Sequence, residues 1–213
     1  MDDKILQFFE DYPEIRYKKG EKILRPNEYF GHVYLVKSGY IRIYKVLKTG
    51  QEITFNWYNP GLQKIVFFGY IQLLSQYHVE ALTDVIIQRV PHGDFRKFVD
   101  ANSEIKDRII RDLTIFFTES LKQVEWLSIP DSYTRIKVML YMLAQRTVKE
   151  GSMGDKKLRL DFKLTHQLIA SFTGLTRETV TIQINKLVSQ GFITREENTI
   201  VFEDAEGLAS EII

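Results

Sequence analysis

The sequence predicts an α+β fold: an N-terminal β-roll of the jelly-roll type, then a long helix, then a small helical domain with a short β-segment. Three changes of pattern predict this order. Residues 15–99 alternate β-branched and aromatic residues with polar ones, residues 103–127 carry apolar residues at helical spacing, and residues 164–191 form two short amphipathic segments around Gly174. The predicted domain boundaries follow these changes: 1–102, 103–129 and 130–213.

The β-rich region begins after a short amphipathic segment at residues 1–12. Its alternation is clearest at residues 40–44 (YIRIY) and 53–58 (ITFNWY). Successive side chains of a strand point to opposite faces, so this alternation gives each strand an apolar face. Turns that contain Gly39 and Gly50 separate the runs. Short strands with turns at this spacing indicate a β-sandwich or roll.

The long helix carries a narrow apolar stripe that repeats every 3.5 residues on average. The stripe consists of Ile110, Leu113, Phe117, Ser120, Val124 and Leu127. Such a stripe suits either a seam between two copies of the chain or a helix packed on its own β domain, and the spacing alone does not separate the two. Pro130 ends this helix, and Asp131 can cap the next one.

The two short segments around Gly174 have the sequence form of a helix-turn-helix. Thr165 can cap the first helix and Thr176 the second, while Gly174 supplies a turn residue that tolerates positive φ. The second helix buries apolar residues at i, i+4 and i+7, and its first turn therefore points polar side chains outward. The apolar residues are Val180, Ile184 and Leu187.

The outward side chains at the start of the second helix have the chemistry of base readers. Arg177 suits guanine O6 and N7, and Glu178 can accept a hydrogen bond from cytosine N4. We expect secondary base contacts from Thr181, Ile182 and Gln183. Contacts to DNA phosphates, or helix caps, are expected from Thr165, His166, Gln167, Thr176 and Lys186.

This part of the chain resembles the DNA-binding domain of the cAMP receptor protein/FNR (CRP/FNR) regulators. The resemblance rests on residues 165–167 (THQ), 176–180 (TRETV), 190–193 (QGFI) and a β-segment at 199–202. It implies a winged helix-turn-helix, a cyclic-nucleotide-binding type of β-roll and a homodimer whose seam is the helical stripe. It also implies transcription regulation through an inverted-repeat site in double-stranded DNA, with RNA polymerase as a further partner.

The second helix departs from the family pattern at two positions. The family commonly has a polar reader two residues after Val180 and an apolar core residue next, whereas this chain has Ile182 and then Gln183. Either the helix is rotated so that Gln183 meets adenine, or Ile182 contacts a thymine methyl group. The operator sequence therefore does not follow from the family.

The expected effector site departs further. In cAMP-binding members a glycine precedes by eleven residues an arginine that binds the cyclic phosphate, and the same count from Gly69 reaches Glu80. An anion there would repel the phosphate, so we expect no cyclic nucleotide in the family pose. Ser120 lies near the helix position where family members touch the base. The candidate effector residues are Phe68, Gly69, Tyr70, Glu80, Ala81 and Ser120.

Three alternatives stay open at this point. The many aromatic residues of the β-rich region either fill its core or line a pocket for an aromatic ligand. One of the four histidines could ligate haem in a gas sensor, although their spacing indicates no metal site. A cyclic-nucleotide-binding module without a DNA role would lack the helix-turn-helix. The cofactor therefore stays unknown.

Composition excludes several classes of function. With no cysteine, the chain has neither disulfides nor a Cys-held iron–sulfur cluster. No motif of nucleotide-binding, hydrolytic or metalloprotease enzymes is present, so we expect no enzyme. The total of 29 Lys and Arg nearly balances 28 Asp and Glu, but residues 162–195 hold four basic residues and one acid. No apolar run is long enough for a membrane span, and we expect a cytoplasmic protein.

Overall fold

The computed structural model describes residues 3–60, 65–66, 70, 74–147, 158–159, 162–196 and 199–203. The chain divides into two compact units, the first containing residues 1–45 and 54–120 and the second residues 46–53 and 121–213. Within the described residues, no helix combines the length and the apolar content that crossing a membrane requires.

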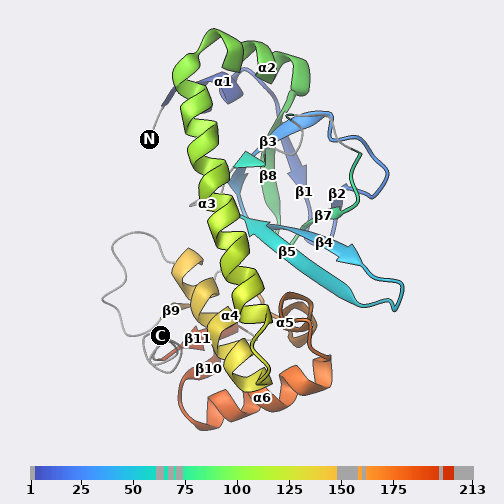
Figure 1. Ribbon diagram of the computed structural model, residues 1–213, viewed down its shortest axis with the longest axis vertical. Helices are drawn as coiled ribbons and strands as arrows, with labels where there is room; N and C mark the ends of the chain where they lie inside the picture. Colours follow the sequence, from blue (N-terminus) through green and yellow to red (C-terminus); the bar gives the residue numbers. More distant parts are fainter. Residues whose placement is uncertain are drawn as a thin grey trace. The chain divides into compact units, whose positions relative to one another are not determined.

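The N-terminal part contains two four-stranded sheets (Figure 1). Strand pairs β1–β8, β3–β8, β2–β7 and β4–β7 are antiparallel. This confirms the predicted β-rich fold. The first sheet has the order β1 (Glu14–Tyr17), β8 (Val85–Pro91), β3 (His32–Ser38) and β6 (Ile65–Val66). The second has the order β2 (Lys22–Leu24), β7 (His78–Ala81), β4 (Ile41–Val46) and β5 (Glu52–Tyr58).

Strand β3 shows how the alternation builds two cores. Tyr34 and Val36 face a cluster that includes residues of both sheets. Val33 and Leu35 point to the other face of β3 and pack with residues from three helices. These helices are α1 (Asp3–Glu10), α2 (His92–Ala101) and α3 (Ser103–Leu127). The first sheet is therefore covered on both of its faces.

Helix α2 corrects the sequence interpretation, which extended the β-rich region to residue 99. Phe95 and Val99 are fully buried and lie four residues apart, on one face of this helix. The helix has only ten residues and directly follows β8. It offers too few turns for a periodic signal that stands out from the neighbouring strand.

Several of the aromatic residues that were expected either in the core or in a pocket are buried in the roll. Tyr34 and Tyr58 belong to the cluster between the sheets, and Tyr40, Tyr44 and Trp57 are also buried. Their burial favours the core interpretation over a ligand pocket.

One turn of the roll requires glycine. Gly39 lies between β3 and β4 with φ of 78°, and a Cβ atom built on it would stand 2.3 Å from the carbonyl oxygen of Asp84. Any other residue would therefore meet both an unfavourable backbone conformation and a backbone clash.

The C-terminal domain contains α4 (Ser132–Thr147), α5 (His166–Thr173) and α6 (Arg177–Ser189), together with a small sheet. The sheet has the order β10 (Ile193–Glu196), β11 (Thr199–Phe202) and β9 (Leu158–Arg159). Its core includes fully buried residues from each helix, among them Leu140, Ile169 and Ile184. Asp131 caps α4 as predicted, since its carboxylate accepts a hydrogen bond of 2.8 Å from the amide of Thr134.

Candidate nucleic-acid interface

Three residues that the sequence singles out mark both ends of α5 and the start of α6. The hydroxyl of Thr165 accepts from the amide of Leu168 at the start of α5, and that of Thr176 accepts from the amide of Thr179 at the start of α6. Gly174 ends α5 with φ of 68°. Both caps and the left-handed glycine are confirmed, and they mark the start and end of α5 and the start of α6.

Helix α6 buries one face and exposes the other. Val180, Ile184 and Leu187 are fully buried, as predicted. The side chains of Arg177 and Glu178 are exposed. The helix therefore presents its first turn, where the sequence placed the principal readers, to solvent.

The structure separates the two alternatives for Ile182 and Gln183. Ile182 is 65% exposed, whereas the amide nitrogen of Gln183 donates to the hydroxyl of Ser132 on α4 at 3.1 Å. The rotation that would turn Gln183 outward is therefore not the one observed, and Ile182 occupies the outer face.

Among the residues expected to touch phosphates, Gln167 and Lys186 are exposed. Lys186 lies in the last turn of α6, and its ammonium group is 4.3 Å from the centre of the Tyr133 ring. This contact orients the lysine without taking its charge out of water.

His166 joins three elements of the domain. Its Nε2 lies 2.7 Å from a guanidinium nitrogen of Arg195 on β10, and its Nδ1 lies 2.7 Å from the hydroxyl of Thr181 on α6. Arginine only donates, so Nε2 accepts and Nδ1 carries the proton of the neutral ring. The Thr181 hydroxyl in turn donates to the carbonyl oxygen of Arg177 at 2.9 Å.

Arg195 is the functional candidate that sequence reasoning passed over. It lies on the small sheet, where it also approaches the side-chain oxygen of Asn185 at 3.5 Å. Its only sequence signal was its place in the locally basic stretch 162–195. Because its partner His166 is 29 residues away in the chain, spacing could not have shown the pair.

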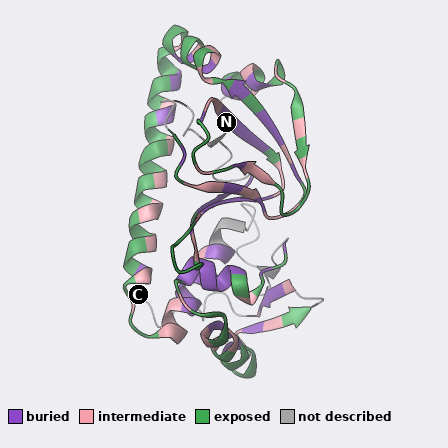
Figure 2. Ribbon diagram, turned by 90° about the vertical axis from the view of Figure 1, so that its right-hand side faces the viewer, coloured by how far each residue is buried: buried purple, intermediate pink, exposed green. Residues whose placement is uncertain are grey.

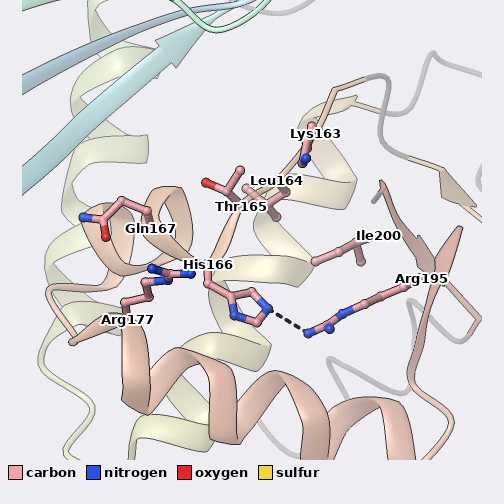
Figure 3. Close-up of a pocket in the computed structure, with 8 residues that line it drawn as sticks. All are labelled: Lys163, Leu164, Thr165, His166, Gln167, Arg177, Arg195 and Ile200. Atoms are coloured by element: carbon pink, nitrogen blue, oxygen red, sulfur yellow. Dashed lines mark hydrogen bonds between the residues drawn. The ribbon is translucent and has the colours of Figure 1, made fainter. Parts of the chain in front are cut away.

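A hollow of about 440 Å³ lies over this pair (Figure 3). It is lined by Lys163, Leu164, Thr165, His166, Gln167, Arg177, Arg195 and Ile200. The lining contributes three permanent cations and no carboxylate, so the potential inside it is positive. Burial, and then the charges of Arg195 and Arg177, lower the pKa of His166. The ring is therefore neutral at pH 7.

The residues expected at an effector site are not brought together in the described part of the chain. Tyr70 packs against the helical cluster and meets Phe95 edge-on. Ala81 is fully buried between the sheets. The hydroxyl of Ser120 donates to the carbonyl of Phe116 in its own helix. Phe68 and Gly69 lie outside the described residues.

Glu80 corrects the physical argument made from the sequence. Its carboxylate lies 2.7 Å from a guanidinium nitrogen of Arg42 and 2.9 Å from the ammonium of Lys22. Burial by itself raises the pKa of Glu80, but the hydrogen bonds from Lys22 and Arg42 hold it below its ordinary value. The expected repulsion between Glu80 and a phosphate is wrong as stated, because two cations neutralise the carboxylate.

No group of three or more His, Asp or Glu side chains that could hold a metal ion occurs among the described residues.

Arg42, with only 7% of its surface exposed, also lies 3.9 Å from the centre of the Tyr44 ring. In the polar cluster of Arg42, Lys22, Glu80 and Tyr44, the two positive charges therefore lie against the carboxylate of Glu80.

A two-sheet roll, a long helix and a winged helix-turn-helix with exposed polar residues on its second helix together define a DNA-binding regulator. Residues 14–102 match the family described as Cyclic nucleotide-binding domain, and residues 134–211 match the Crp-like helix-turn-helix domain. The chain belongs to the CRP/FNR family of transcription regulators. This family is one of transcription regulators and not of enzymes.

Individual relatives agree with this assignment. The chain is 27% identical over 199 residues to the transcriptional regulator SdrP of Thermus thermophilus, covering 91% of each chain. It is 25% identical over 202 residues to the global nitrogen regulator of Synechococcus elongatus, covering 92% of this chain and 88% of the relative. The structure of FixK2 from Bradyrhizobium japonicum superposes with a TM-score of 0.78 at 20% identity, covering 92% and 95%.

Proposed function

We propose that the protein is a homodimer that reads an inverted repeat in double-stranded DNA with α6 in the major groove. The observation that carries this proposal is the exposed face of α6 formed by Arg177, Glu178 and Ile182. Arginine and glutamate supply hydrogen bonds to base edges, and isoleucine supplies an apolar contact to a thymine methyl group. The neighbouring positive hollow favours the DNA backbone.

The exposed stripe of α3 supports dimerisation through this helix. Ile105 and Ile109 pack against the chain's own roll, whereas Ile110, Phe117 and Val124 are 62%, 62% and 61% exposed. The long helix is exposed along much of its length (Figure 2). This exposed apolar stripe is distinct from the face of α3 that packs on the chain's own core. It therefore favours a seam between two copies of the chain over packing of the stripe on its own β domain.

We further propose that the effector, where one acts, is not cAMP in the family pose. Arg42 is mostly buried and already paired with Glu80, so it is not available to a phosphate. A Mycobacterium tuberculosis relative at 23% identity is named as cAMP-activated, and a Xanthomonas campestris regulator of known structure is titled c-di-GMP responsive. Family membership therefore does not identify the effector of this chain. A protein that binds DNA without any effector fits the same observations.

A protein of this function acts on DNA in the cytoplasm, and we extend the proposal to contact with RNA polymerase. Selection of bound sequences from random double-stranded DNA tests the central proposal. We expect a two-fold symmetric motif whose half-sites lie about one helical turn, roughly 34 Å, apart. Recovery of sequences without two-fold symmetry would show that α6 does not read DNA as a pair.

A further inference from the structure

The hollow between α5, α6 and the small sheet combines permanent cations with one titratable acceptor. Lys163 contributes from the segment before α5, Arg177 from α6 and Arg195 from β10, and His166 lies among them (Figure 3). Glu178 also belongs to the first turn of α6 but does not line the hollow. Within the described residues, the groups that face His166 are thus cationic or neutral.

Lys163 and Arg195 approach the hollow from different elements, which suits a tetrahedral anion, and Arg177 adds to the positive potential of the lining. Arginines present planar sets of N–H donors that match phosphate oxygens, and lysine adds a compact charge. Lys163 and Arg195 are both exposed, and Arg195 is held by its 2.7 Å contact with His166. A DNA backbone phosphate has the charge and the size for this site.

His166 cannot receive such a phosphate in its present protonation state. Its Nε2 holds a lone pair that accepts from Arg195, and its Nδ1 proton is directed at Thr181. A phosphate oxygen facing this lone pair would be repelled. A proton taken up from solvent at Nε2 would instead make the ring a donor on both nitrogens.

The surroundings of His166 make this protonation conditional on an anion. In the free protein an imidazolium beside Arg195 and Arg177 would place three positive charges together, and burial adds to the cost. A phosphate in the hollow would offset these charges and accept from both Nε2 and Arg195. The Nδ1 contact to Thr181 is compatible with either state because a hydroxyl accepts as well as donates.

We propose that this hollow binds one DNA backbone phosphate per half-site and that His166 takes up a proton as the phosphate enters, so that operator binding depends on pH. This inference rests on the proposed DNA-binding function. By linkage, affinity rises as the pH falls between the pKa of His166 in the complex and its lower pKa in the free protein. One proton per half-site limits the change to about tenfold per pH unit for each half-site.

The test compares the affinity of the full-length protein for a selected operator from about pH 6 to 8, at fixed ionic strength. We expect wild type to bind more tightly at low pH and His166→Gln to lose this slope, because the Gln carbonyl can still accept from Arg195 but takes no proton. His32→Gln, in the β-roll, is the matched control and should keep the slope. An equal slope in His166→Gln would overturn the proposal.

Two further measurements do not depend on the variant. Calorimetry of wild type with operator, in buffers of different ionisation enthalpy, should count close to one proton taken up per half-site, and a count of zero overturns the proposal. NMR titration of His166 with inorganic phosphate identifies the source of the anion. A raised His166 pKa with phosphate, combined with pH-independent operator binding, would assign the hollow to a free anion and refute the DNA contact.

The outcomes also separate this inference from the proposed function. Specific operator binding with no His166-dependent slope refutes the proton coupling and leaves DNA reading intact. Failure to bind any symmetric site refutes both.

Discussion

The side-chain amide of Gln183 donates a hydrogen bond to the hydroxyl of Ser132 across 3.1 Å, in agreement with the rotation of α6 that buries Val180, Ile184 and Leu187. With Gln183 held toward α4, the neighbouring Ile182 is turned to the surface, where it is 65% exposed. With this orientation Ile182, and not Gln183, lies on the outer face of α6.

We therefore expect Ile182→Ala and Gln183→Ala to differ in a selection experiment. Loss of the Ile182 side chain removes the apolar contact that we propose with a thymine methyl group and should relax the preference at one base pair per half-site. Gln183→Ala should leave the motif unchanged, since the amide is engaged within the protein. A motif that changes only in Gln183→Ala would contradict the observed orientation of α6.

Arg177→Ala should weaken operator binding by about 1–3 kcal/mol and relax one position of each half-site, because the bidentate pair that we propose with guanine would be lost. Lys186→Ala is the matched control on the same helix. Removal of the phosphate contact that we propose for Lys186 should weaken binding evenly across sequences and reduce the dependence of affinity on salt. Fluorescence anisotropy with the selected site and single-base variants distinguishes the two patterns, and an unchanged base preference in Arg177→Ala would exclude it as a reader.

Phe117→Glu should produce monomers. The side chain lies in the exposed stripe of α3, and two like charges buried across a seam would repel each other. Arg111→Glu changes charge at an exposed position on another face of the same helix and should leave the dimer intact. Analytical ultracentrifugation measures both variants. A dimeric Phe117→Glu protein would place the interface elsewhere.

The local parts of the fold could be predicted from the sequence. Thr165, Gly174 and Thr176 act within one helical turn of where they stand, so their cap and turn roles follow from residue type and spacing. The alternation at residues 40–44 and the stripe of α3 are equally local patterns. Helix α2 was missed because its two buried residues, Phe95 and Val99, give a weak periodic signal next to a strand.

The charged contacts could not be predicted, because their partners are distant in the chain. Glu80 was interpreted as an unpaired anion, yet Arg42 lies 38 residues away on a neighbouring strand. The link from His166 to Arg195 likewise spans the helix-turn-helix and the small sheet. Such pairs depend on strand order and helix packing, which residue spacing does not encode.

Cyclic nucleotides should not bind in the family pose. Arg42 and Lys22 are already paired with Glu80, so a cyclic phosphate would have to displace a carboxylate from a partly buried cluster. Isothermal titration with cAMP and with cGMP should give no binding heat at nucleotide concentrations where a cAMP-activated regulator saturates. Submicromolar binding would show that a nucleotide site lies elsewhere or that this pair opens.

Glu80→Gln should destabilise the protein by about 3 kcal/mol, because it leaves the charge of the mostly buried Arg42 without its carboxylate partner. The folded-state pKa of Glu80 is lowered, so its stabilisation is present above the ordinary value of 4.5 and is lost as the pH falls through the lower folded-state value. Denaturant unfolding of wild type should therefore show a larger loss of stability below about pH 4.5 than Glu80→Gln shows. Asp84→Asn is the control, since the pair of Asp84 with Lys18 is exposed and should contribute little. Equal acid sensitivity in wild type and Glu80→Gln would mean that the cluster does not stabilise the roll through its charges.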